Sequence, residues 1–291
     1  MSTADPIIQQ SFKSGEERAN GLIARKRAAS FAPTAGFLIA EGDSWFDYPF
    51  FQDILEALEE DHHYKIRSAA HAGDTAEGMA YEDNQLEKLR KLFEEMKEDQ
   101  KTPKAVLLSC GGNDVAQFCE LLLNHKKSKL PVLNESIVDG LLNQRTKAAI
   151  SALISSVMVF SQTYFGTQLP ILLHGYGYPI PDGRGYPVLS LSGPWLKPGF
   201  TAKGYVTNDP QTTAELRQNA DVMVALIDRF HAILTEIASA PEFAGVVKLV
   251  DLRSVFSNDL TGAKYQQDWR DEMHATKPAF KRAAALIAQT I

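Results

Sequence analysis

Five short, strongly apolar segments alternate along the chain with longer segments of helical periodicity, and this alternation constrains the fold more than any other feature. The apolar segments are each expected to be a strand: "FLIAEGDS" (37–44), "YKIRSAA" (64–70), "KAVLLSCGG" (104–112), "PILLHGY" (170–176) and "VVKLVDL" (246–252). Several are almost continuously apolar, which is typical of strands that are buried on both faces of a parallel sheet.

The segments between these strands carry apolar residues at three- and four-residue spacing, which predicts helices. The expected helices cover residues 51–61, 81–100, 146–165, 212–238 and 278–291. Repeated alternation of strand and helix favours an α/β fold, in which a mainly parallel sheet has helices on both faces.

The chain shows no internal repeat and no Pro/Gly/Ser-rich linker between two cores, so we expect one domain over residues 36–291. Residues 1–35 are expected to form a helical extension lying on that domain. A stretch dense in Gly, Pro and aromatic residues, at about 175–210, is expected to be a long loop insertion. Connections this long are uncommon in compact domains and are often functional, although a packed surface loop is the alternative. A connector at 125–136 should expose its lysines.

Composition narrows the class of protein. The 291 residues carry a net charge of −6, with 44% hydrophobic and 23% charged residues, as in soluble globular proteins. The negative charge argues against a broad nucleic-acid surface. The first residues lack a basic-then-apolar leader, and no apolar run approaches the roughly 20 residues of a membrane span. We therefore expect a cytoplasmic protein with no membrane span; the sequence does not indicate its oligomeric state.

Several polar residues and one glycine follow the carboxyl ends of the expected strands, which is where open α/β sheets bind ligands. Ser44 ends the first strand, Gly73 follows the second, and Asn113 follows the third. Asp271 and His274 come after the fifth strand and before the final helix. A parallel sheet would bring all of them to one edge.

These residue types meet the needs of acyl transfer. A serine hydroxyl is a poor nucleophile unless a base takes its proton, and His274 could serve as that base for Ser44. Asp271 lies three residues earlier and could orient the imidazole. The Asn113 amide and the backbone N–H groups of Ser44 and Gly73 could stabilise an oxyanion. Each residue alone is ordinary in a turn or cap, whereas their occurrence together at strand ends favours a catalytic site.

Rival motifs are missing from the sequence. It contains no G-x-S-x-G nucleophile elbow, no G-x-x-x-x-G-K-[ST] phosphate loop and no H-E-x-x-H metal motif. Cys110 and Cys119 do not have zinc-ligand spacing and are interpreted as buried thiols. No metal site is therefore predicted.

Four blocks resemble the signature blocks of the SGNH (GDSL-type) hydrolases: "EGDSWFD" (41–47), "AHAGDTAEG" (70–78), "SCGGNDV" (109–115) and "DEMHATKPAF" (271–280). The resemblance implies a flavodoxin-like three-layer α/β/α sandwich with a mainly parallel five-stranded sheet, and no cofactor. It implies Ser44 as nucleophile, His274 as base, Asp271 as its partner, and Gly73 and Asn113 as oxyanion donors with the Ser44 N–H. Trp45 replaces the leucine of the GDSL name, and "HATKP" replaces the commoner His-Pro-Asn; both changes bear on pocket shape.

The resulting prediction is a metal-independent serine esterase that cleaves a small-molecule ester through an acyl-enzyme. In the long loop, Tyr176, Tyr178 and Trp195 are predicted to contact the substrate, and Tyr186 and Phe200 are further candidates, because aromatic side chains suit acyl chains and sugar faces. Transfer of the acyl group to another acceptor and deacetylation of a carbohydrate are enzyme alternatives. A binding protein that works through the long loop is the alternative from another class.

Overall fold

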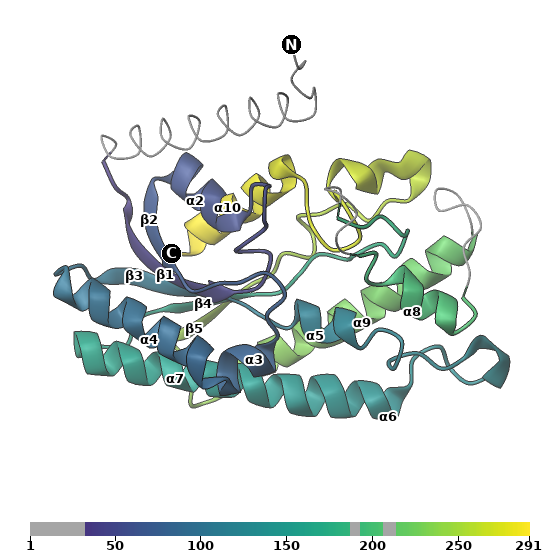
Figure 1. Cartoon of the computed structure of the whole chain (residues 1–291), viewed down its shortest axis with the longest axis horizontal. Coiled ribbons are helices and arrows are strands. Elements are labelled where there is room, and N and C mark those ends of the chain that lie inside the picture. The colour runs from purple at the N-terminus through teal and green to yellow at the C-terminus, as the bar shows by residue number, and fades with distance from the viewer. Residues whose placement is uncertain (1–32, 187–192, 206–213) are drawn as a thin grey trace, which may run out of the picture.

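A computed structural model of the chain describes residues 33–186, 193–205 and 214–291 (Figure 1). The predicted N-terminal helical extension falls on residues 1–32, outside the described residues, and residues 33–35 lead into the first strand. The long loop is described over 175–186 and 193–205. The predicted single domain over 36–291 stays a prediction, although the described part of that range is arranged around one sheet.

The sheet has five strands, all paired in parallel, in the order β2-β1-β3-β4-β5. The strands are β1 (Gly36–Gly42), β2 (Tyr64–Ser68), β3 (Pro103–Ser109), β4 (Ile171–His174) and β5 (Val247–Val250). This is the flavodoxin-like order, in which the chain runs from β1 to one edge and then returns to continue on the other side. The switch point therefore lies between the carboxyl ends of β1 and β3.

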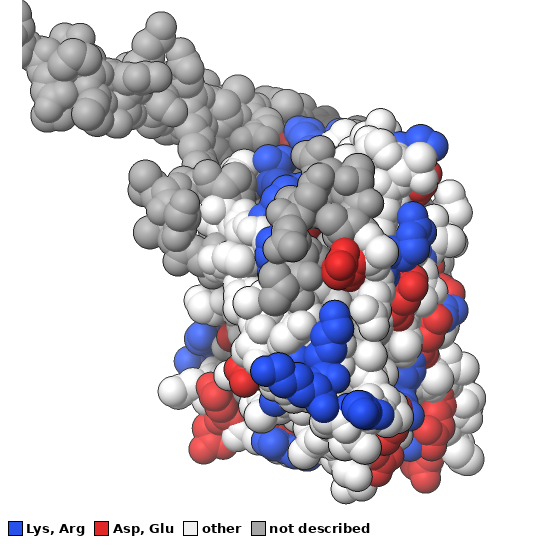
Figure 2. Space-filling model, turned by 90° about the vertical axis from the view of Figure 1, so that its right-hand side faces the viewer, with Lys and Arg blue, Asp and Glu red and all other residues white. Residues whose placement is uncertain are grey.

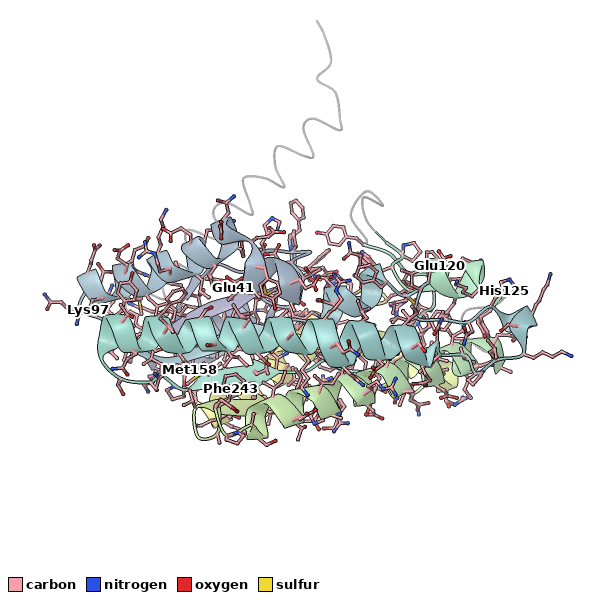
Figure 3. The ribbon with its side chains drawn as sticks, turned by 90° about the horizontal axis from the view of Figure 1, so that it is seen from below. Glu41, Lys97, Glu120, His125, Met158 and Phe243 are labelled. Carbon is pink, nitrogen blue, oxygen red and sulfur yellow. The ribbon has the colours of Figure 1, made fainter. Side chains whose placement is uncertain are left out.

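Helices cover both faces of the sheet, which confirms the predicted three-layer α/β/α sandwich (Figure 1). One face carries α2 (Ile54–His62) and α10 (Lys277–Thr290), which contact each other. The other face carries α3 (Ala76–Tyr81), α4 (Asp83–Glu98), α7 (Lys147–Phe165) and α9 (Ala214–Ser239). Figure 3 shows α7 and α9 side by side across this second face. Shorter helices are α5 (Gly112–Gln117), α6 (Glu135–Val138) and α8 (Lys197–Ala202).

Local side-chain chemistry sets the start and end of the helix that follows the first strand. The Asp53 side chain accepts a hydrogen bond from the Glu56 N–H at 2.9 Å, so α2 begins after Asp53 rather than at the predicted residue 51. His63 adopts a left-handed conformation with φ 59° and ends the helix. The residues between β1 and α2 are thereby left for the turn that contains Ser44.

Helix α7 continues α6 through a π-helical segment (Asp139–Thr146), so that one helix runs from Glu135 to Phe165. By length and composition alone this helix could cross a membrane. No such segment was expected from the sequence, because serines interrupt the apolar residues of this helix. In the fold, Ile150, Leu153 and Val157 of α7 are fully buried, and α7 contacts α3, α4 and α9.

The connector at 125–136 lies at one end of the molecule. Leu123 and Leu133 pair in an isolated antiparallel bridge, and Lys126, Lys127 and Lys129 are exposed between them. Figure 2 shows this end of the molecule, where several lysine and arginine side chains gather. The exposed lysines agree with the expectation of a solvated surface.

Candidate active site

The turn that follows β1 presents Ser44 at the switch point of the sheet. Asp43 is buried and holds this turn through its backbone and its carboxylate. Its N–H donates to the Ser109 carbonyl at 3.0 Å, while its Oδ1 accepts from the Trp45 N–H at 3.0 Å and the Ser109 hydroxyl at 2.8 Å. Its Oδ2 accepts from the Tyr176 hydroxyl at 2.5 Å. Burial raises the pKa of Asp43, and the hydrogen bonds from Tyr176, Trp45 and Ser109 act against that rise.

Glycine is required where this turn leaves the sheet. A Cβ on Gly42 would lie 2.7 Å from the Cβ of Ser109 and 2.8 Å from the Ser109 carbonyl oxygen. A larger residue would therefore push β1 and β3 apart at the point where Ser44 is presented.

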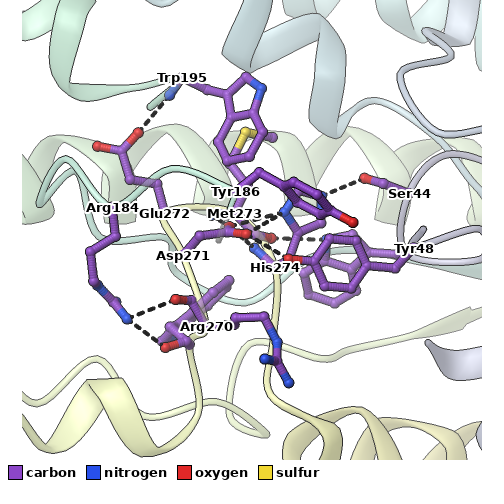
Figure 4. A network of polar contacts seen from close by, with 12 residues as sticks. Ser44, Tyr48, Arg184, Tyr186, Trp195, Arg270, Asp271, Glu272, Met273 and His274 are labelled. Atoms are coloured by element: carbon purple, nitrogen blue, oxygen red, sulfur yellow. Dashed lines mark hydrogen bonds and ion pairs between the residues drawn. The ribbon is translucent and has the colours of Figure 1, made fainter. Parts of the chain in front are cut away.

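Ser44, His274 and Asp271 form a continuous hydrogen-bonded chain (Figure 4). The His274 Nε2 lies 2.7 Å from the Ser44 Oγ. The His274 Nδ1 lies 2.9 Å and 3.0 Å from the two carboxylate oxygens of Asp271. All three side chains are buried. This geometry allows His274 to accept the serine proton while Asp271 holds the imidazole in place.

Tyr48 extends this series of hydrogen bonds beyond Asp271. Its hydroxyl donates to Asp271 Oδ2 at 2.7 Å, and its ring stacks on the His274 imidazole with centroids 4.2 Å apart. Burial alone would raise the pKa of Asp271, but hydrogen bonds from His274, Tyr48 and the Met273 N–H outweigh it and hold the pKa below its usual value. Asp271 is therefore ionised at neutral pH and can stabilise an imidazolium.

Gly73 and Asn113 line the same pocket as Ser44. Gly73 has φ +98°, and a Cβ there would meet no atom within 4 Å, so its backbone faces open space. The Asn113 Nδ2 donates one hydrogen bond to the Asp74 carbonyl at 2.9 Å, which orients the side-chain amide. An amide nitrogen has two N–H groups, so one remains for a substrate oxygen. The structure thus brings the five predicted catalytic residues together.

The pocket around Ser44 has a volume of about 320 Å³, which falls within the range of small-molecule sites. Its walls include Phe50, Tyr186 and Trp195 in addition to the catalytic residues. Trp195, a predicted substrate-binding residue, also meets the His274 ring edge-on at 5.2 Å.

The other two predicted substrate-binding residues lie outside this pocket. Tyr176 is buried behind the Ser44 turn, because its hydroxyl binds the Asp43 carboxylate. Tyr178 points toward α9 and donates to Asp228 Oδ1 at 2.8 Å. Phe200, the further candidate, is fully buried. The prediction placed Tyr176 and Tyr178 at the substrate because the sequence does not reveal these polar partners.

Glu272 is a site-forming residue that the sequence analysis missed. Its Oε1 accepts from the N–H groups of Gly183 at 2.8 Å and Lys197 at 3.1 Å. Its Oε2 accepts from those of Trp195 and Leu196, each at 2.7 Å. Burial raises the pKa of Glu272 to about 7, and these hydrogen bonds act against the rise. One carboxylate next to Asp271 therefore binds both described parts of the long loop.

Arg184 makes a second link between the long loop and the catalytic loop (Figure 4). Its Nη1 donates to the carbonyls of Trp269 at 2.8 Å and Arg270 at 3.0 Å. Its Nε pairs with Asp182, which also accepts from the Tyr265 hydroxyl at 2.8 Å. The loop is therefore fixed against the residues that precede Asp271.

In the part of the chain that the structure describes, no cluster of three or more His, Cys, Asp and Glu side chains is arranged to hold a metal ion. Cys110 and Cys119 are free and buried, in agreement with their interpretation as buried thiols. Burial raises the pKa of both thiols, that of Cys119 to about 12.

Solved structures with similar folds were found by comparison of the whole chain. A lipase from a goat rumen metagenome matches with a TM-score of 0.50 and 15% identity, over 88% of this chain and 97% of its own. A catalytic mutant of an acetylxylan esterase from Geobacillus stearothermophilus matches with a TM-score of 0.46 and 14% identity, over 89% and 94%. A putative SGNH hydrolase from Slackia heliotrinireducens matches with a TM-score of 0.45 and 11% identity, over 88% and 99%.

No family model matches the chain, and no curated protein matches it in sequence. The match to the lipase shows that the chain shares the fold of that protein, and this fold agrees with the α/β/α sandwich that the four sequence blocks implied. At these identities the likeness concerns the fold.

Proposed function

We propose that the protein is a serine esterase that hydrolyses carboxylic esters through an acyl-enzyme. The observation that carries this proposal is the unbroken chain of hydrogen bonds from Tyr48 through Asp271 and His274 to Ser44, which ends in a pocket of about 320 Å³. A serine that only capped a turn would not need a buried imidazole and a buried carboxylate behind it.

In the first half-reaction the Ser44 oxygen attacks the ester carbonyl carbon, and His274 Nε2 takes the hydroxyl proton. The carbonyl oxygen becomes an oxyanion, which accepts hydrogen bonds from the Ser44 and Gly73 N–H groups and from the Asn113 amide. When the carbon–oxygen bond to the alcohol breaks, His274 gives the proton to the departing oxygen. The products are an acyl-Ser44 ester and a free alcohol.

In the second half-reaction a water molecule gives its proton to His274 as its oxygen attacks the acyl-enzyme. The tetrahedral intermediate then releases the carboxylic acid, and Ser44 recovers its proton from His274. If an acceptor alcohol replaces water at this step, the same residues perform acyl transfer. A cytoplasmic location and a small-molecule ester substrate, without a nucleic-acid partner, stay predictions.

Replacement of the proposed nucleophile tests this function. We expect wild-type protein to hydrolyse p-nitrophenyl acetate and to be labelled by a fluorophosphonate, and Ser44→Ala to lose both. Ser155→Ala on the exposed side of α7 is the matched control and should keep both. Equal hydrolysis by wild type and Ser44→Ala would refute Ser44 as nucleophile. A wild type that is neither labelled nor active would favour a binding protein, and product masses measured with added alcohols separate hydrolysis from transfer.

A further inference from the structure

A second, smaller cavity lies next to the pocket of Ser44. Its volume is about 30 Å³, and the residues that line it are mostly apolar side chains and glycines, among them Val115, Ala116, Leu196 and Ile227. A space of this volume holds one small group, and its apolar lining offers no hydrogen bonds to a water molecule. It therefore suits a hydrocarbon group.

The two spaces meet at one residue. Among the described residues, Met273 is the one that lines both the pocket and the inner cavity. Two consecutive residues of the long loop line different spaces: Leu196 lines the cavity, and Trp195 lines the pocket. Figure 4 shows Met273 beside Trp195 and His274. The Met273 side chain thus stands between the Ser44 pocket and an apolar space.

The backbone of Met273 is held independently of its side chain. Its N–H donates to Asp271 Oδ1 at 2.8 Å, and its carbonyl accepts from the Trp45 indole N–H at 3.1 Å. A substitution of the side chain therefore leaves these two backbone hydrogen bonds available to hold the catalytic loop. Methionine is also the flexible filler of apolar gaps, so this wall is the part of the pocket that most easily changes shape.

The geometry of the reaction indicates which part of the substrate faces this wall. In the tetrahedral intermediate the oxyanion is directed at Gly73 and Asn113, and the leaving oxygen must lie near His274 Nε2. The acyl chain and the alcohol take the remaining directions, along walls that include Phe50, Tyr186, Trp195 and Met273. The apolar cavity beside Met273 suits the acyl chain, which places the alcohol along the other walls.

We propose that Met273 is the specificity-determining residue for acyl chain length. Its side chain closes the acyl end of the pocket and restricts the enzyme to short acyl groups, and its removal joins the inner cavity to the pocket so that a longer chain fits. This inference rests on the proposed esterase function.

The test compares kcat/KM for p-nitrophenyl butanoate with kcat/KM for p-nitrophenyl acetate within each protein. Wild type should favour acetate. Met273→Ala should raise the butanoate-to-acetate ratio by about tenfold or more, since each added methylene in an apolar pocket changes transition-state binding. Met273→Val serves as a milder second variant if Met273→Ala does not fold.

Filling the inner cavity should reverse the effect. Ala116 lines this cavity from α5, so the double variant Met273→Ala/Ala116→Leu should return the ratio toward the wild-type value. Met158→Ala is the matched control, because Met158 lies on α7 away from both spaces (Figure 3) and should not change the ratio. A second series, acetate esters of alcohols of increasing length, should respond little to Met273→Ala.

Three outcomes would overturn the proposal for Met273 while leaving the esterase function intact. They are equal use of butanoate and acetate by wild type, an unchanged butanoate-to-acetate ratio in active Met273→Ala and Met273→Val, and a response confined to the alcohol series. A wild type that hydrolyses none of these esters and whose Ser44 is not labelled by a fluorophosphonate would refute the esterase function and this inference together.

Discussion

The two sides of the Ser44 pocket are built in different ways. The catalytic side, formed by the turn after β1 and the loop before α10, is held through side chains: Tyr48, Asp271 and His274 bind one another and are buried. The wall formed by the long loop is held through its backbone, whose N–H groups bind the carboxylate of Glu272. Trp195 on that wall is only half-buried.

This difference separates chemistry from recognition. In the proposed mechanism, a substitution on the catalytic side removes a group that takes part in proton transfer. A substitution of a wall side chain leaves the backbone N–H donors in place, since every residue other than proline carries one. We therefore expect that side chains of the wall can change, and with them the substrate, while the reacting groups keep their positions.

Asp271→Asn should have the largest effect. The amide cannot hold the imidazole in the required tautomer or stabilise an imidazolium, so kcat should fall by about 10³- to 10⁴-fold, or about 4–5.5 kcal/mol. Initial rates with p-nitrophenyl acetate measure the loss, and Asp139→Asn on the exposed π-helical segment is the control. Activity within a few-fold of wild type would remove Asp271 from the catalytic side.

Tyr48→Phe should come next. The phenylalanine ring keeps the stacking on His274 but loses the 2.7 Å hydrogen bond to the Asp271 carboxylate. A hydrogen bond to a charged group contributes about 1.5–3 kcal/mol, so kcat should fall by about ten- to a hundredfold with KM little changed. A change confined to KM would show instead that Tyr48 belongs to substrate recognition.

Glu272→Gln tests the hydrogen bonds that link the catalytic loop to the wall formed by the long loop. The new amide presents N–H groups to backbone N–H donors, so at least two of the four hydrogen bonds should be lost and the Trp195 wall should shift. We expect a rise in KM of about tenfold, or about 1.4 kcal/mol, with a smaller change in kcat.

Trp195→Ala should add little to the loss in a Glu272→Gln background, because both changes disturb the same wall. Exposed Glu120→Gln is the matched control. Additive effects of Glu272→Gln and Trp195→Ala would mean that Glu272 does not act through Trp195.

Glu41→Gln should have the smallest effect on activity. Its effect is expected instead in how the free energy of unfolding depends on pH. Burial raises the pKa of Glu41 to about 7, with hydrogen bonds from Gln85 and the Gly42 N–H acting against the rise. Among the described residues, its Oε2 has no hydrogen-bond partner, which suits a protonated group. Between the two pKa values the folded state keeps a proton that the unfolded chain releases, so this group lowers stability as pH rises from about 4.5 to about 7.

Urea unfolding at about pH 5.5 and about pH 8 measures this contribution. The wild type should lose stability on going to the higher pH, and Glu41→Gln should flatten that loss by about 2 kcal/mol. If the free energy of unfolding depends on pH identically in the two proteins, the pKa of Glu41 is the same in the folded and unfolded states, which would contradict this prediction.

The sequence was enough to predict the sheet and the group of residues that gather around Ser44, because both depend on local patterns. The five apolar segments became the five strands, although each strand is shorter than predicted at one end or both. The predicted third strand reached residue 112, for example, but β3 ends at Ser109, because Gly111 has φ +105° and turns the chain into α5. The catalytic residues were found because strand ends in a parallel sheet share an edge.

The wall of the pocket could not be predicted, because it depends on partners that are distant in the sequence. Tyr178 and Asp228 are 50 residues apart, and nothing near either residue indicates that they bind each other. Glu272 resembles any surface acid until the backbone N–H groups of 183 and 195–197 are folded onto it. Aromatic residues are apolar enough for a substrate site and for a core, so the composition of the loop did not separate the two.

The hydrogen bond between His274 and Ser44 spans 230 positions of the chain. During synthesis the serine and its turn leave the ribosome early, whereas the base follows only after β5 and is placed when α10 packs against α2. A growing chain therefore has Ser44 before it has the imidazole that binds it, and the two meet only after most of the sheet has been made.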